Sequence, residues 1–209
     1  MIKNAKYKVN KKNGGNVPVP NDIRVIYVPV SCGVCMECMK KKAREWQIRL
    51  SEDIKENKNG KFITLTFNEE SLLELKKEFG KDDNTVATKA VRRFLERWRK
   101  KFKKSVRHWL VTELGHKGTE RIHLHGILYT DEDIKTISDI WSYGYTWEGK
   151  YVNERTINYI IKYIHKQDSD HKEYKPIVLT TAGIGRNYTE SENFKKNKYK
   201  EENTKESYT

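Results

Sequence analysis

Hydrophobic positions along the chain follow two periods, one typical of strands and one typical of helices. In the segment 61–67 apolar and polar side chains alternate, which predicts a strand with one threonine-bearing face. From residue 86 to residue 104 apolar residues recur every three or four positions, which predicts a long amphipathic helix with a basic outer face. The other predicted elements are helices at 40–55, 69–80, 131–141 and 154–167, strands at 23–30, 106–114, 121–129 and 176–180, and a turn at 141–147 leading into a strand that ends near residue 152.

The strands at 106–114 and 121–129 predict an antiparallel hairpin, because a short segment with two glycines joins them. His123 and His125 flank Leu124 in the second strand, so both imidazoles lie on the same face. Such a pair is typical of metal ligands, although it also suits the solvated face of a half-buried strand. Folding the hairpin brings Glu113 near the histidines. The three residues then make a set that leaves positions on a metal ion open for substrate.

The segment 154–167 offers candidate nucleophiles. On a helical wheel four isoleucines gather on one side and Tyr159, Lys162, Tyr163 and Lys166 gather on the other. Tyrosines on helices are often core residues, but here the isoleucines already define the core side. A phenol is a weak nucleophile at its ordinary pKa, and the neighbouring ammonium groups favour its ionised form.

Composition limits the classes of partner. The 209 residues are 36% hydrophobic and 34% charged, enough for one core with a heavily charged surface, and the net charge of +13 indicates a polyanionic partner. Since no apolar run reaches transmembrane length and the N-terminus lacks the apolar segment of a signal peptide, we expect nucleic acid and a cytoplasmic setting rather than a membrane. We expect a flexible basic arm at 1–22, one folded domain at 23–189 and a disordered polar tail at 190–209.

Two further motifs permit more than one interpretation. Cys32, Cys35 and Cys38 have the spacing of a zinc site within the segment 31–38, but a fourth ligand is missing, and small core residues at the start of a helix are the alternative. The loop with Gly183, Gly185 and Arg186 is suited to presenting backbone amides to a phosphate, and equally to being a flexible loop.

Taken together, these motifs resemble the HUH endonuclease superfamily, and within it the replication initiation proteins of microviruses, especially the gokushovirus-like branch. The matching segments occur in the family's order over about residues 30–190. They are CGVCMEC with the basic helix that follows, FITLTF, ELGHKGTERIHLHG, WSYGYTW, YIIKYIHK and AGIGRNY.

The resemblance implies an α+β fold, a central antiparallel sheet flanked by helices as in HUH endonucleases and RRM-like domains. It implies that His123, His125 and Glu113 bind Mg²⁺ or Mn²⁺. It also implies that Tyr159 and Tyr163 are paired nucleophiles, with Lys162 between them, for nicking single-stranded DNA at a replication origin.

Further expectations concern partners and alternatives. We expect DNA contacts from Arg121, Lys166 and Arg186, zinc at the cysteine cluster, a host helicase and polymerase as partners because the chain has no P-loop, and the cytoplasm of a bacterial host as location. One alternative is a single-strand transposase or plasmid initiator of the same superfamily. Another is a non-catalytic, zinc-containing nucleic-acid-binding module.

Overall fold

The computed structural model describes residues 14–16, 32–33, 35–115, 120–149, 151–166 and 173–197. The chain divides into two units, Met1–Gly33 and Val34–Thr209, and every helix and strand below belongs to the second. In the first unit, Gly14 and Gly15 form a turn with positive φ angles. The strand predicted at 23–30 lies outside the described residues, as do most of the predicted arm and residues 198–209 of the predicted tail.

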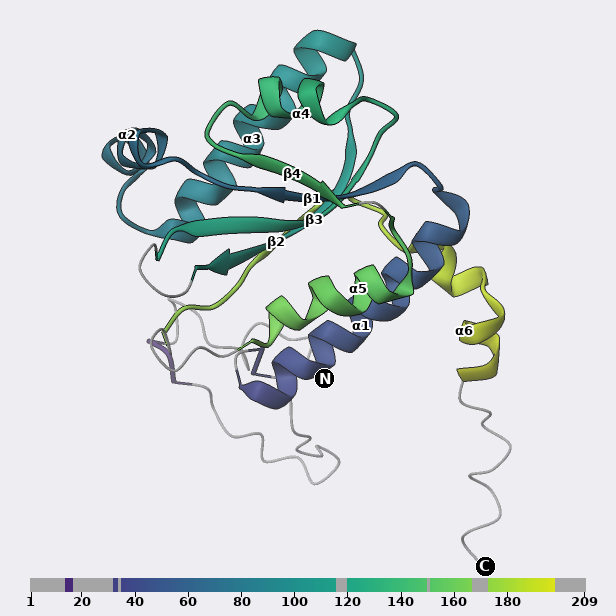
Figure 1. Cartoon of the computed structure of the whole chain (residues 1–209). Helices are drawn as coiled ribbons and strands as arrows, with labels where there is room; N and C mark the ends of the chain where they lie inside the picture. The colour runs from purple at the N-terminus through teal and green to yellow at the C-terminus, as the bar shows by residue number, and fades with distance from the viewer. Residues whose placement is uncertain are drawn as a thin grey trace, which may run out of the picture. The chain divides into compact units, whose positions relative to one another are not determined.

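A central antiparallel sheet organises the described part of the second unit (Figure 1). Its five strands have the order β4-β1-β3-β2-β5, so β3 lies in the middle and pairs with both β1 and β2. The bounds are β1 Gly60–Leu65, β2 Arg107–Leu114, β3 Ile122–Tyr129, β4 Thr146–Gly149 and β5 Val178–Thr180. Helices cover the sheet, which confirms the predicted α+β class.

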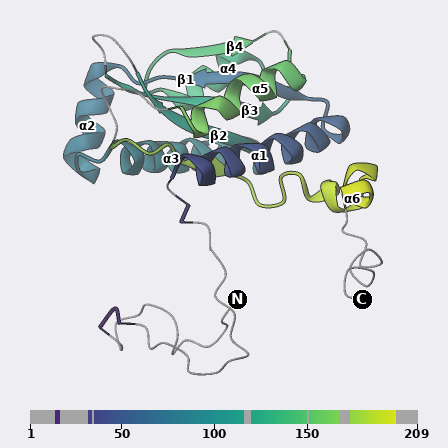
Figure 2. The ribbon, with the colours of Figure 1, turned by 90° about the horizontal axis from the view of Figure 1, so that it is seen from below.

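Helices lie on both faces of the sheet: α2, α3 and α4 on one, α1 and α5 on the other (Figure 1). Seen from below, α1 and α5 run across the sheet next to each other (Figure 2). The bounds are α1 Met36–Glu56, α2 Glu69–Phe79, α3 Asp83–Phe102, α4 Ile134–Trp141, α5 Glu154–Ile161 and α6 Glu192–Asn197, with 3₁₀ turns η3 at Lys162–Ile164 and η4 at Arg186–Glu190.

Two hydrophobic cores follow from the alternation of side chains along the strands. On one face Leu110 and Leu124 pack against the apolar stripe of α3. On the other face Trp109 and Ile127 pack against the isoleucines of α5 and against α1. Residues on odd-numbered positions of β2 therefore face α5, and this is the face on which Glu113 lies.

Local capping explains where the helices begin. The Asp82 carboxylate accepts a hydrogen bond from the Thr85 amide at 2.8 Å, so α3 begins at Asp83, three residues before the predicted start. Asn153 and Thr156 form a capping box at the start of α5. The helix predicted at 154–167 is α-helical only as far as Ile161 and then tightens into the 3₁₀ turn η3.

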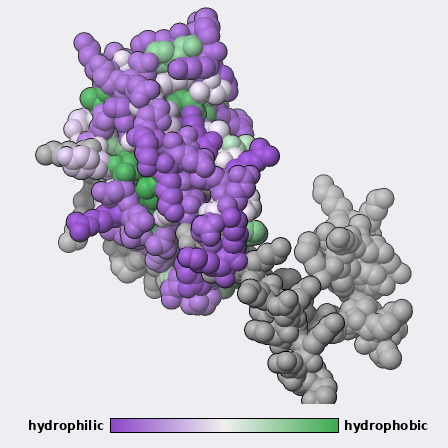
Figure 3. Space-filling model, turned by 90° about the vertical axis from the view of Figure 1, so that its right-hand side faces the viewer, coloured by the Kyte–Doolittle hydropathy of each residue, from purple (hydrophilic) through white to green (hydrophobic). Residues whose placement is uncertain are grey.

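The surface agrees with the composition of the chain. On the face shown in Figure 3, hydrophilic residues cover most of the surface and hydrophobic residues form small separate patches. Among the residues that the structure describes, no helix combines the length and the hydrophobicity needed to cross a bilayer.

A buried carboxylate joins three separate segments. Asp53 in α1 is only 1% exposed, and it forms an ion pair with Arg107 at the start of β2. It also accepts a hydrogen bond from the Gly185 amide at 2.9 Å. Gly185 has a φ of 67°, and a Cβ there would lie 2.4 Å from the Cβ of Arg49. The glycine loop is therefore shaped for close packing on α1, and this amide binds a carboxylate of the protein rather than a phosphate.

The Asp53→Asn substitution should lower the free energy of unfolding by about 2–4 kcal/mol, because it leaves Arg107 without its buried anion. Urea denaturation at neutral pH measures this change. Glu37→Gln is the control: Glu37 makes an exposed ion pair with Lys40 in the same helix, so it should change stability by less than about 1 kcal/mol. Equal effects of the two substitutions would contradict the joining role of Asp53.

Candidate active site

A carboxylate and two imidazoles meet on the α5 face of the sheet. Glu113 on β2 lies directly opposite His123 on β3 in the strand register, and His125 follows two residues later on the same face. Ligand atoms of the three residues lie within 4.8 Å of one another. His125 Nε2 is 2.8 Å from Glu113 Oε2. The hairpin thus brings together the three residues that the sequence singled out as a set.

Thr64 holds the other side of the His125 ring. It pairs with His125 across β1 and β3, and its Oγ1 lies 3.0 Å from His125 Nδ1. A hydroxyl both donates and accepts hydrogen bonds, so Thr64 suits either tautomer of the imidazole. When Nδ1 carries the proton and donates to Thr64, the Nε2 lone pair is left for a metal ion. Sequence reasoning found the threonine face of this strand but could not place it against a histidine.

The charges around the site favour its metal-binding form. Lys166 Nζ is 2.6 Å from Glu113 Oε1. Burial alone would raise the pKa of Glu113, but the hydrogen bonds from His125 and Lys166 outweigh it and hold that pKa below its usual value. Burial lowers the pKa of His123. At neutral pH, Glu113 is therefore ionised and His123 is neutral, as metal ligands must be.

The donor set fits a divalent ion. Two imidazoles and one carboxylate, clustered at the edge of a core, leave positions free for water or a substrate oxygen. Imidazole nitrogens suit first-row transition ions, whereas carboxylate oxygens suit Mg²⁺ and Mn²⁺.

Two tyrosines stand beside this cluster. The ring of Tyr163 in η3 stacks on the ring of His125, with centroids 4.4 Å apart and an interplanar angle of 8°. The Tyr163 hydroxyl donates to the Tyr159 hydroxyl oxygen at 2.6 Å. Tyr159 is 42% exposed, and Lys162 Nζ lies 4.0 Å from the centroid of its ring.

The prediction that both tyrosines lie on an outer helical face was wrong for Tyr163, which is 6% exposed. A helical wheel describes one helix in isolation, but here β3 reaches the flank of the helix through His125. Burial, and then the hydrogen bond to Tyr159, raise the pKa of Tyr163, against the expected effect of neighbouring ammonium groups. Lys166 is instead committed to Glu113.

Comparison with known proteins decides the family. The sequence model of the family described as replication-associated protein, ORF2 type, matches residues 60–168, just over half of the chain. The chain belongs to this family. The match covers Glu113, both histidines and both tyrosines, and it gives this replication-associated protein a role in DNA replication. No curated protein and no solved structure matches the chain.

The remaining predicted residues of the replication-associated protein lie apart from the cluster. Arg121 Nη2 is 3.3 Å from a carboxylate oxygen of Glu69, and Arg186 opens η4 beyond the glycine loop. Cys35 is the N-cap of α1, with its Sγ 3.3 Å from that of Cys38. Cys32 belongs to the other unit of the chain.

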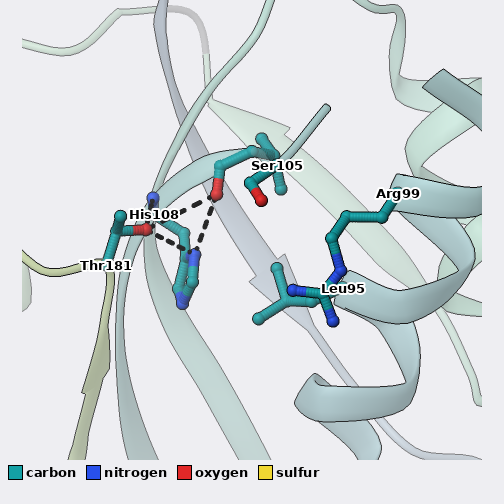
Figure 4. Close-up of a pocket in the computed structure, with 6 residues that line it drawn as sticks. Leu95, Arg99, Ser105, His108 and Thr181 are labelled. Atoms are coloured by element: carbon teal, nitrogen blue, oxygen red, sulfur yellow. Dashed lines mark hydrogen bonds between the residues drawn. The ribbon is translucent and has the colours of Figure 1, made fainter. Parts of the chain in front are cut away.

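A small cavity of about 140 Å³ lies on the opposite face of the sheet (Figure 4). His108 and Thr181 line it, and His108 Nδ1 lies 2.9 Å from Thr181 Oγ1. Burial lowers the pKa of His108, so this histidine is a neutral core residue. Because it alternates with Glu113 along β2, it faces α3 and is separate from the cluster.

Glu113→Gln should weaken binding of Mn²⁺ by more than the roughly 10- to 100-fold typical of residues that only orient a ligand, because it removes the anionic donor. Isothermal titration of the full chain with Mn²⁺ measures the affinity. The matched control is Glu148→Gln, since Glu148 on β4 also pairs with a lysine, Lys61, at 2.8 Å. Equal affinity in both variants would show that the cluster holds no metal.

Thr64→Val should weaken Mn²⁺ binding about 10- to 100-fold, because His125 loses the partner that orients its ring. Thr64→Ser keeps the hydroxyl and should retain most of the affinity. Thr66→Val is the control: Thr66 lies on the same face of the chain two residues later, and its hydroxyl donates to the Tyr145 carbonyl instead. A weakened Thr66→Val variant, or an unaffected Thr64→Val variant, would contradict the orienting role.

Proposed function

We propose that this replication-associated protein initiates replication by cutting single-stranded DNA at an origin and joining itself to the new 5′ end. The proposal rests above all on the stacking of Tyr163 on His125, which puts two hydrogen-bonded phenols beside a His–His–Glu cluster. A divalent-ion site next to a nucleophile is the arrangement that phosphoryl transfer requires. The family match supports the replication part of the proposal.

In this proposal Glu113, His123 and His125 hold Mg²⁺ or Mn²⁺. When bound, the ion supplies charge stabilisation to the scissile phosphate. Lys166 lies beside Glu113, and Lys162 lies over the Tyr159 ring, so both place positive charge where the phosphate would enter.

The tyrosine hydroxyl attacks phosphorus. A bond forms between the phenolic oxygen and phosphorus while the bond from phosphorus to the 3′ oxygen breaks. The phenol loses its proton and the departing 3′ oxygen gains one, leaving a 5′-phosphotyrosine and a free 3′-hydroxyl. The phosphotyrosine retains the energy of the cleaved bond, so rejoining to another 3′-hydroxyl needs no nucleoside triphosphate.

The hydrogen bond between the tyrosines favours Tyr159 as the first nucleophile. Tyr159 oxygen accepts the proton of Tyr163, and an accepted hydrogen bond stabilises a developing phenolate. Tyr159 is also the more exposed of the two. Once Tyr159 holds a 5′ end, Tyr163 remains to cut the next copy of the origin, as rolling-circle replication requires.

The wider setting follows from the resemblance to microvirus initiators of the gokushovirus-like branch. In this proposal the folded domain at 23–189 works in the cytoplasm of a bacterial host, whose helicase and polymerase extend the 3′ end. Arg121 and Arg186 contact the DNA backbone at a distance from the cluster.

The double substitution Tyr159→Phe, Tyr163→Phe should abolish covalent attachment to DNA, because it removes both nucleophilic oxygens. The protein is incubated with Mn²⁺ and single-stranded oligonucleotides of randomised sequence, and adducts are separated under denaturing conditions and sequenced. Tyr159→Phe alone should remove most of the first adduct, whereas Tyr163→Phe should leave it. Tyr151→Phe, a control at an exposed tyrosine outside the cluster, should form the adduct normally.

No adduct with any oligonucleotide would refute the proposal. Zinc binding at the cysteines without cleavage would favour a non-catalytic binding module. Captured sequences that match transposon ends or a plasmid origin would instead favour a transposase or plasmid initiator of the same superfamily.

A further inference from the structure

A cavity of about 460 Å³ opens beside Tyr159. Its lining residues come from β1, β4 and α5: Phe62, Thr64, Trp147, Arg155, Thr156 and Tyr159. Thr64 also contacts His125, and Tyr159 is hydrogen-bonded to Tyr163, so the cavity adjoins the cluster directly. Its volume lies within the range of about 300–1,000 Å³ that is usual for ligand pockets.

Aromatic rings form the walls. Phe62 is buried at the base, and the rings of Trp147 and Tyr159 meet it edge-on, with centroids 5.4 Å and 5.8 Å away. Trp147 is 44% exposed although its indole is largely apolar. Trp147 pairs with Thr64 across β4 and β1, which fixes its position relative to His125. Exposed aromatic surface next to a cavity suits a flat, apolar ligand.

A positive charge completes the cavity. Arg155 lies in the first turn of α5 and supplies a guanidinium group to the lining. A flat apolar surface beside a cationic group matches the two halves of a nucleotide, its base and its phosphate. The net charge of +13 favours the same kind of ligand.

We propose that this cavity binds one unpaired nucleobase of the DNA strand next to the scissile phosphate. The base stacks on Trp147 above Phe62, and Arg155 contacts the adjoining phosphate. This inference rests on the proposed function only in assuming a single-stranded DNA substrate. A base held in the cavity cannot also be stacked and paired in a duplex. The cavity therefore selects single strands and sets the distance between the bound base and the cut.

The test compares DNA with and without bases. Fluorescence anisotropy measures binding of the full chain to labelled oligothymidylate and to an abasic oligonucleotide of equal length, in EDTA so that no cleavage occurs. Trp147→Ala should weaken binding to oligothymidylate about tenfold and leave binding to the abasic strand unchanged, since base–aromatic stacking is typically worth a factor of this order. Arg155→Ala should weaken binding to both strands and reduce its salt dependence.

Two controls separate stacking from folding. Trp147→Phe keeps an aromatic ring and should retain most of the affinity for oligothymidylate. Tyr151→Ala removes a more exposed aromatic residue that does not line the cavity, and it should bind like the unaltered chain. An equal loss on both strands in Trp147→Ala, or no loss on either, would overturn the base site.

The base site and the nuclease proposal fail separately. If adducts form with Mn²⁺ but Trp147→Ala binds oligothymidylate normally, the base site is wrong and the nuclease remains. If Trp147→Ala loses base-dependent binding but no adduct ever forms, the base site stands and the nuclease is wrong.

Discussion

The pairing of β3 with strands on both sides is the constraint on which the candidate site depends. Because β2 and β1 both run antiparallel to β3, one histidine on its central face receives Glu113 from one neighbour and Thr64 from the other. A shift of one residue in either register would turn one of these partners to the opposite core. The same alternation sends Leu110 and Leu124 into the α3 core, so packing of the hydrophobic residues fixes the register that the site needs.

The third side of His125 is covered by a helix end rather than a strand. The isoleucines of α5 hold the helix on the sheet, and the tightening into η3 sets Tyr163 flat on the imidazole. Burial there disfavours the phenolate of Tyr163, and Tyr163 passes its hydrogen bond to the more exposed Tyr159. Two tyrosines four residues apart thus occupy different environments, which is a physical basis for different roles.

Away from the reacting groups, features that suggested chemistry are explained by packing. The glycine loop brings its Gly185 amide to the buried Asp53 carboxylate, and a side chain at that glycine would collide with α1. His108 is a neutral residue of the opposite face. In contrast, Thr64 and Trp147 carry no motif, yet both flank the cluster and the cavity.

The sequence by itself determined the α+β class, the hairpin, the histidine pair and the tyrosine spacing, because periods of two and of about four residues depend only on local backbone geometry. It also determined which residues were candidates, since the set of Glu113, His123 and His125 needs only a hairpin to assemble. Tertiary structure decided which partners reach those residues. Thr64 is 61 positions from His125, and Tyr163 is buried by a strand that no helical wheel includes. Such contacts depend on the order of strands in the sheet and on how a helix packs over it, and neither is encoded in a local pattern.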